Sequence, residues 1–105
     1  MHELFHFVWV RLGNGARRGY ESLLLTEARE AARGELGWSA EMRKLELSTR
    51  EGRQWREYVC ESFCDTAAWL YGGLRTHDEF TLSPRFRRRR AAWFRQTFDG
   101  RVILT

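Results

Sequence analysis

EGRQWREYVCESFCDTAAWLY, residues 51–71, decides the fold class. Apolar and small side chains recur along this stretch at steps of three and four residues, which is the period of one face of an α-helix. They are Trp55, Tyr58, Val59, Ser62, Phe63, Thr66, Trp69 and Leu70. Gly72 and Gly73 then end the pattern. The stretch predicts the longest helix of a mainly α-helical protein with about four to five helices.

Two segments before residue 35 also have helical character. Residues 2–12 are apolar on nearly every face and stop at a Gly-Asn-Gly sequence, which predicts a buried helix, with a buried strand over residues 4–10 as the alternative. Residues 21–34 combine strong helix formers with regularly spaced Leu and Ala and end at a glycine. We expect a second helix there, and no sheet before the first helix.

The remaining chain gives one clear helix and two weaker signals. Ser83 and Pro84 suit the N-cap and first position of a last helix that carries four aromatic residues. Residues 37–52 contain Ser39 as a possible helix cap and KLELST as a strand-like alternation, so we expect an irregular segment with some helix. RVILT, residues 101–105, allows at most a short C-terminal strand.

Length and composition predict one folded domain spanning residues 1–105. The chain is 43% hydrophobic and has a single Pro, which argues against disorder. No apolar run approaches the roughly 18 residues of a membrane span, and the apolar start lacks the basic segment of a signal peptide. Two cysteines, Cys60 and Cys64, are too few for a secreted disulfide framework. We expect a cytoplasmic protein without a membrane partner.

The positive charge is concentrated at the end of the chain. The net charge is +4, yet residues 84–105 carry seven cations and one acid. Arg87, Arg88, Arg89 and Arg90 are consecutive, so on a helix they point in four directions and cannot all line one groove. We interpret Arg85 and residues 87–90 as a solvated face and consider a nucleic-acid partner unlikely.

HELFH, residues 2–6, is the first half of a candidate metal site. On a helix His2 and His6 share a face, so both imidazoles reach one ion, with Glu3 beside them. A catalytic zinc site usually takes three protein ligands. Glu61 and Asp65 share a face of the longest helix and can supply the third, because buried carboxylates need a partner.

HELFH followed by E-x-x-x-D on a later helix resembles the gluzincin-type HExxH zinc metallopeptidases, over residues 2–6 and 61–65. The resemblance implies that His2 and His6 bind Zn²⁺, that Glu3 is the general base, that Glu61 is the third ligand and that Asp65 orients a ligand histidine. It also implies a compact helical zincin-like domain, complete here or the C-terminal part of a larger one. Its substrate would be a peptide or protein.

Two further residues have weaker candidate roles. Hydrolysis of a peptide bond requires a donor to the tetrahedral oxyanion, and His77 is the best candidate, with Tyr71 and Arg75 behind it. Cys64, three positions after Glu61, is more simply a core residue but is the substitute ligand if Glu61 does not bind the metal.

Simpler interpretations stand beside the peptidase hypothesis. HELFH can be an ordinary helix start, and Glu61 with Asp65 can be carboxylates paired with arginines. The main alternative function is a non-catalytic basic helical module that binds nucleic acid or a protein partner through residues 84–95. A third is a zincin-like protein that retains metal but has lost hydrolysis.

Overall fold

The computed structural model describes residues 2–72 and 81–98, and within these ranges it contains five α-helices and no strand. The helices are α1 (His2–Arg11), α2 (Asn14–Arg29), α3 (Trp38–Leu45), α4 (Gly52–Tyr71) and α5 (Pro84–Phe98). The prediction of a compact, mainly α-helical protein is confirmed. The proposed C-terminal strand lies outside the described residues. No helix in the described ranges is long and apolar enough to cross a membrane.

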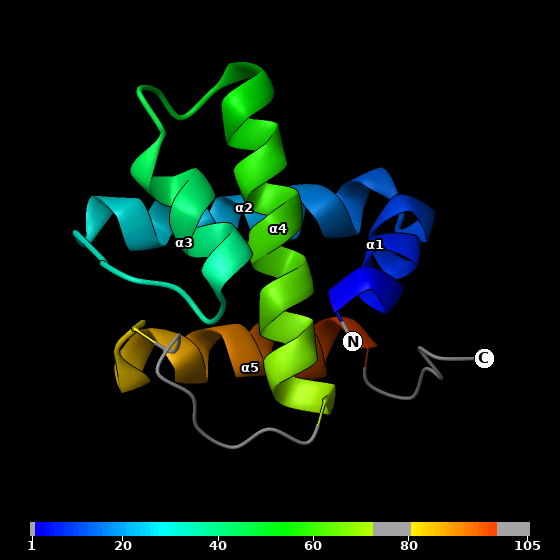
Figure 1. Ribbon diagram of the computed structural model, residues 1–105. Helices are drawn as coiled ribbons and strands as arrows, with labels where there is room; N and C mark the ends of the chain where they lie inside the picture. Colours follow the sequence, from blue (N-terminus) through cyan, green and yellow to red (C-terminus); the bar gives the residue numbers. More distant parts are fainter. Residues whose placement is uncertain (1, 73–80, 99–105) are drawn as a thin grey trace.

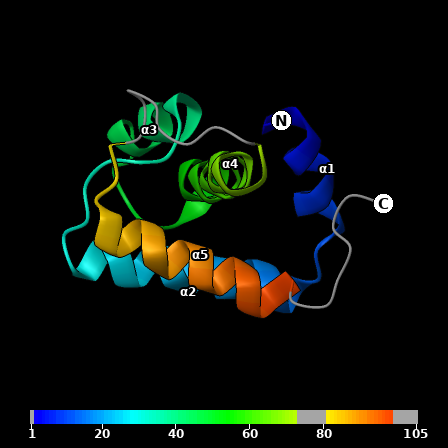
Figure 2. The ribbon, with the colours of Figure 1, turned by 90° about the horizontal axis from the view of Figure 1, so that it is seen from below.

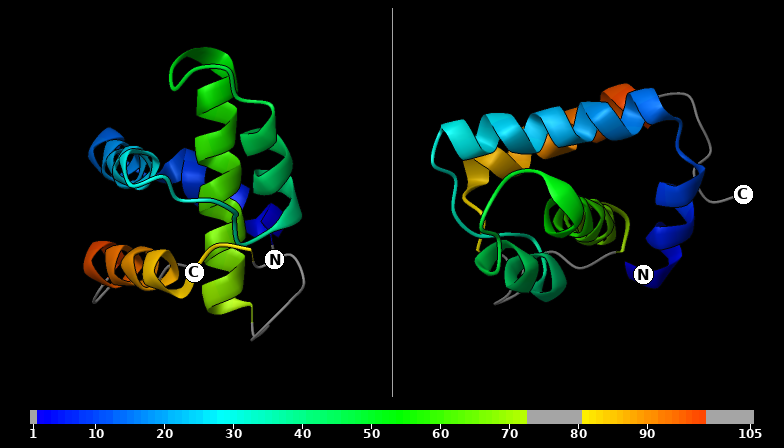
Figure 3. Two further views of the ribbon diagram at one scale, coloured as in Figure 1. Left: turned by 90° about the vertical axis from the view of Figure 1, so that its left-hand side faces the viewer. Right: turned by 90° about the horizontal axis from the view of Figure 1, so that it is seen from above.

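Helix α4 is the centre of the fold, as its length and pattern predicted. It contacts each of the other four helices, and Figure 1 shows it running through the middle of the molecule. Helices α2 and α5 lie side by side and antiparallel in a layer on one side of α4 (Figure 3). Figure 2 shows α1 and α3 on opposite flanks of α4. HELFH lies in α1 and residues 61–65 lie in α4, so the two motifs belong to helices that pack on each other.

Helix α1 forms where the alternative was a strand, but it is buried on one side only. Phe5 is 1% exposed and packs into the core, whereas Phe7 and Val10 are 62% and 63% exposed. The expectation of burial on nearly every face was therefore wrong. The apolar run covers all faces of the helix, whereas within the described residues α1 packs mainly on α4.

Aromatic side chains from four helices form the core. Phe63 of α4 is fully buried, with its ring centroid 4.9 Å from that of Trp9, 5.6 Å from Tyr20 and 5.1 Å from Phe94. These separations are typical of favourable aromatic pairs. Phe63 belongs to the apolar face predicted for residues 51–71, and this face is buried in the core.

The basic segment differs from the expected solvated face. Arg90 is completely buried and bonded to Glu27 and Glu35, while Arg85 and Arg89 both pair with Glu30. The reason is helical spacing: Arg90 lies four residues after Phe86 and four before Phe94, both of which are buried. Part of this segment is thus committed to holding α5 against α2.

The segment between α2 and α4 contains one short helix, in agreement with the moderate helix content expected. Helix α3 begins at Trp38, one residue before the Ser39 that was considered as its cap, and the strand-like KLELST lies partly in its end. Ala40 is fully buried against the core, and α3 packs along α4. The loop before α3 therefore comes close to the middle of α4.

Candidate metal centre

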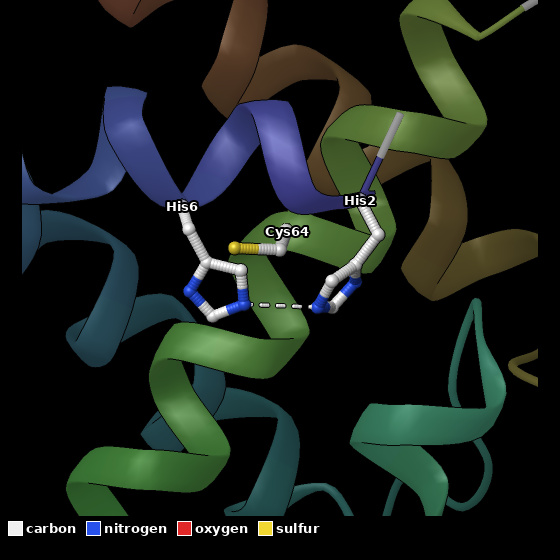
Figure 4. A group of neighbouring side chains, drawn as sticks. All are labelled: His2, His6 and Cys64. Atoms are coloured by element: carbon white, nitrogen blue, oxygen red, sulfur yellow. Dashed lines mark hydrogen bonds between the residues drawn. The ribbon is translucent and has the colours of Figure 1, made fainter.

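The two histidines of HELFH lie together against α4. Because they are four residues apart on α1, both rings leave the same face of the helix. Their Nε2 atoms are 3.0 Å apart, and the rings meet edge to face with centroids 4.9 Å apart. Figure 4 shows the two rings with this contact between them. Packing of α1 on α4 places the pair over residues 60–65.

Glu61 brings a third ligand atom to the same point. Its Oε2 atom is 2.7 Å from His2 Nε2 and 3.6 Å from His6 Nε2. This oxygen is buried, yet it has no hydrogen-bond partner among the described residues. The contact between Glu61 Oε2 and His2 Nε2 is therefore short, but its geometry is not that of a hydrogen bond. A buried carboxylate oxygen without a partner is costly, and a cation at this point relieves the cost.

The spacing of the three atoms fits one small metal ion. Ligand atoms 2.0–2.1 Å from a tetrahedral zinc lie about 3.3–3.4 Å from one another. The three separations observed, 2.7, 3.0 and 3.6 Å, bracket that range. Two imidazole nitrogens and one carboxylate oxygen are also a ligand set that zinc accepts. His2, His6 and Glu61 could therefore hold a zinc ion.

Asp65 holds the opposite side of the His2 ring. Its Oδ1 atom is 2.5 Å from His2 Nδ1, and its Oδ2 atom accepts a hydrogen bond of 2.9 Å from the backbone N–H of Ala40. Burial raises the pKa of Asp65, although the Ala40 N–H and His2 act against that shift. With Nδ1–H donating to Asp65, His2 presents the lone pair of Nε2 toward Glu61 and His6.

Cys60 occupies the equivalent position beside His6. Its Sγ atom is 3.6 Å from His6 Nδ1, within hydrogen-bonding distance for sulfur. A hydrogen bond from Cys64 lowers the pKa of the Cys60 thiol, while burial opposes that shift. The sequence analysis did not give Cys60 this role. Helical spacing alone does not give this contact, because it depends on how α1 and α4 are packed against each other.

Cys64 lies behind the two imidazoles and is completely buried. One ring nitrogen each from His2 and His6 and the Cys64 Sγ atom are all within 4.8 Å of one another. The Cys60 hydrogen bond and burial both raise the pKa of the Cys64 thiol. The structure thus places two candidate third ligands, Glu61 and Cys64, on the same side of α4.

The candidate catalytic residues are less closely connected with this cluster. Glu3 is exposed, next to His2 on α1, and makes no hydrogen bond or ion pair within the described residues. His77 and Arg75 lie outside the described residues. Tyr71 is partly exposed at the end of α4, where its ring contacts Phe5 and Phe94. The geometry therefore supports a metal site more directly than it does any particular proton donor or acceptor.

Four of the predicted site residues thus lie together, namely His2, His6, Glu61 and Asp65. Without a metal, the same contacts can be interpreted as a salt bridge between His2 and the carboxylates of Glu61 and Asp65. That interpretation does not explain why Glu61 Oε2 is buried without a hydrogen-bond partner among the described residues. Comparison with protein-family models, with curated proteins and with solved structures gave no match to this chain.

Proposed function

We propose that this protein is a zinc-dependent peptidase whose metal is held by His2, His6 and Glu61. The observation that carries the proposal is the convergence of His2 Nε2, His6 Nε2 and Glu61 Oε2, the last of them buried and without a hydrogen-bond partner. The HExxH and ExxxD motifs favour a catalytic site over a purely structural one. A free Cys60 and Cys64 fit a reducing compartment such as the cytoplasm.

The roles of the chain's own residues follow from their positions. Asp65 accepts a hydrogen bond from His2 Nδ1 and so keeps His2 Nε2 free to bind. Cys60 does the same for His6 through a weaker contact. Glu3, whose carboxylate is exposed beside His2, would accept the proton of the attacking water and pass it to the leaving amine. A bound zinc ion supplies Lewis acidity that polarises the scissile carbonyl and lowers the pKa of water.

Metal analysis of three variants tests this assignment. Purified without chelator, the protein should carry about one zinc per chain. His6→Ala and Glu61→Ala should bind zinc much more weakly, because each removes a ligand atom. Glu3→Gln should keep the zinc but hydrolyse an unstructured peptide about 100-fold more slowly, because the amide cannot accept a proton.

Glu46→Gln is the matched control, since Glu46 is an exposed glutamate at the end of α3, away from the cluster. It should change neither zinc content nor hydrolysis. Zinc affinity equal to that of the parent in both His6→Ala and Glu61→Ala would contradict the site. Equal hydrolysis by Glu3→Gln and the parent would contradict the mechanism, while zinc without any hydrolysis would leave a metal-binding protein that is not a peptidase.

A further inference from the structure

Cys64 lies at the metal centre without a role in the proposed reaction. Its sulfur points from α4 toward the His6 ring, beside the contact between the two histidines (Figure 4). It is within 4.8 Å of a ring nitrogen of each. A thiol that only filled the core would have no need of two imidazole nitrogens beside it, because cysteine packs as a small apolar side chain.

The position of Cys64 on α4 suits a ligand that acts together with Glu61. Residues three apart on a helix share a face, so both side chains point toward α1. Sulfur and nitrogen ligands of one tetrahedral zinc lie about 3.5 Å apart, given bonds of about 2.3 and 2.0 Å. The sulfur is already within 4.8 Å of both nitrogens, so it would have to come closer to each of them by no more than about 1.3 Å.

We propose that Cys64 is a fourth protein ligand, which closes the metal site formed by His2, His6 and Glu61. Catalytic zinc sites leave one position open, whereas sites with four protein ligands are closed. The thiolate would thus occupy the position that hydrolysis requires, and the protein would hydrolyse peptide only slowly while the sulfur is bound. That the blocked reaction is peptide hydrolysis rests on the proposed function, whereas the binding of Cys64 to the metal does not.

Cobalt substitution tests the coordination directly. Co²⁺ takes the same ligands as Zn²⁺ and absorbs visible light, and a thiolate bound to it adds a strong charge-transfer absorption in the near ultraviolet. Titrated with Co²⁺, the reduced parent protein should show this absorption at saturation. Cys64→Ser and Cys64→Ala should lose it while keeping the visible bands that His2, His6 and Glu61 produce.

Cys60→Ser is the matched control, because it removes a thiol of the same helix that lies one turn away. At saturating Co²⁺ it should keep the charge-transfer absorption, whatever its effect on affinity through the contact of Cys60 with His6. Circular dichroism should give the same helix content for all variants. Removing a direct ligand should also weaken zinc binding by more than the roughly 10–100-fold that loss of an outer hydrogen-bond partner costs.

The possible results separate the two proposals. Cobalt bound without charge-transfer absorption in the parent, or an absorption lost in Cys60→Ser and retained in Cys64→Ser, overturns the role of Cys64 and leaves the proposed function standing. Failure to bind cobalt at all overturns both. If the absorption depends on Cys64, peptide hydrolysis should be faster in Cys64→Ala than in the parent. Absence of hydrolysis in both proteins would then overturn the peptidase while the fourth ligand stands.

Discussion

His2 has contacts at both ring nitrogens, and they are of different kinds. Nδ1 faces Asp65 Oδ1 at 2.5 Å, while Nε2 faces His6 and Glu61. Only one arrangement of protons suits both sides if a metal binds: the proton must be on Nδ1 and the lone pair on Nε2. Asp65 therefore sets which nitrogen of His2 is available.

Asp65→Asn should accordingly weaken zinc binding while keeping the fold. An asparagine oxygen can still accept the N–H of Ala40, but its amide then directs N–H toward His2 Nδ1 and favours the tautomer with a proton on Nε2. We expect a loss of about 10–100-fold in affinity, measured by competition with a coloured chelator. Glu57→Gln, which changes a half-exposed carboxylate of the same helix that pairs with Arg43 and Arg53, is the control. Equal affinities for parent and Asp65→Asn would show that Asp65 does not orient the ligand.

The residues that meet at the cluster could be predicted from the sequence because helical spacing decides them. His2 and His6 share a face of one helix and Glu61 and Asp65 a face of another, so only the packing of α1 on α4 was left open. The contact of Cys60 with His6 could not be predicted, because it depends on the distance and rotation between the two helices. Whether a metal binds stays a prediction.

The approach of α3 to α4 depends on one small residue. Gly37 precedes α3, and a Cβ atom placed on it would lie 2.3 Å from Cγ and 2.4 Å from Oδ2 of Asp65. Its backbone is extended, with φ near −179°, so space and not conformation requires glycine here. The loop before α3 is therefore in direct contact with the Asp65 carboxylate that faces His2, and no space for a side chain remains between them.

Gly37→Ala should disturb both the packing of α3 and the candidate metal centre. The added methyl group must displace Asp65, so we expect a loss of about 1–3 kcal/mol in the free energy of unfolding, together with weaker zinc binding. Urea denaturation and the chelator competition measure the two effects. Gly15→Ala is the matched control, because a Cβ atom there has nothing within 4 Å and the residue is helical. It should be neutral or stabilising by up to about 1 kcal/mol. A neutral Gly37→Ala would contradict the close approach.

At this scale the sequence predicted the long helices, but it left both helix and strand open for the segment that contains α3. Helix α4 carries a continuous apolar face, and Pro84 begins α5 as expected. The segment that contains α3 has eight helical residues with only Ala40 fully buried, so its pattern carried too little periodicity to exclude a strand. Its helix is held instead by contacts with α4 that are distant in sequence.

The whole molecule is tied together by a buried polar network around Arg90. The guanidinium of Arg90 donates to both carboxylate oxygens of Glu27 and of Glu35, with distances between 2.7 and 2.9 Å. Thr66 and Tyr58 of α4 complete it, Thr66 with Arg90 at 3.1 Å and Tyr58 by a hydrogen bond to Glu35. Arg90 of α5 thus joins α2, the loop that follows α2, and α4. We had expected Arg90 in solvent because it belongs to a run of arginines.

The network makes stability depend on pH in a direction that can be calculated. Burial acts to raise the pKa of Glu35, but Arg90, then Lys44 and Tyr58, more than offset it, so the pKa is below its ordinary value. The stability that Glu35 contributes is therefore present above the unfolded pKa of about 4.3 and is lost as the pH falls through the folded value. The ion pairs should make the parent protein less stable in acid.

Arg90→Gln should destabilise the protein and reverse this pH dependence. Removing the cation leaves Glu27 and Glu35 buried without their main partner, which costs about 3–5 kcal/mol at neutral pH. Burial then raises the pKa of Glu35 above 4.3, so the folded variant takes up a proton more readily than its unfolded chain and gains stability as the pH falls. The difference in unfolding free energy between parent and variant should accordingly shrink between about pH 7 and pH 4, whereas the three histidines are common to both proteins and cancel.

Urea denaturation at several pH values measures this difference. Arg88→Gln, which changes an exposed arginine of the same run, is the control and should change stability by no more than about 0.5 kcal/mol. A difference that stays constant with pH would show that the carboxylates around Arg90 are not charged partners in the folded protein.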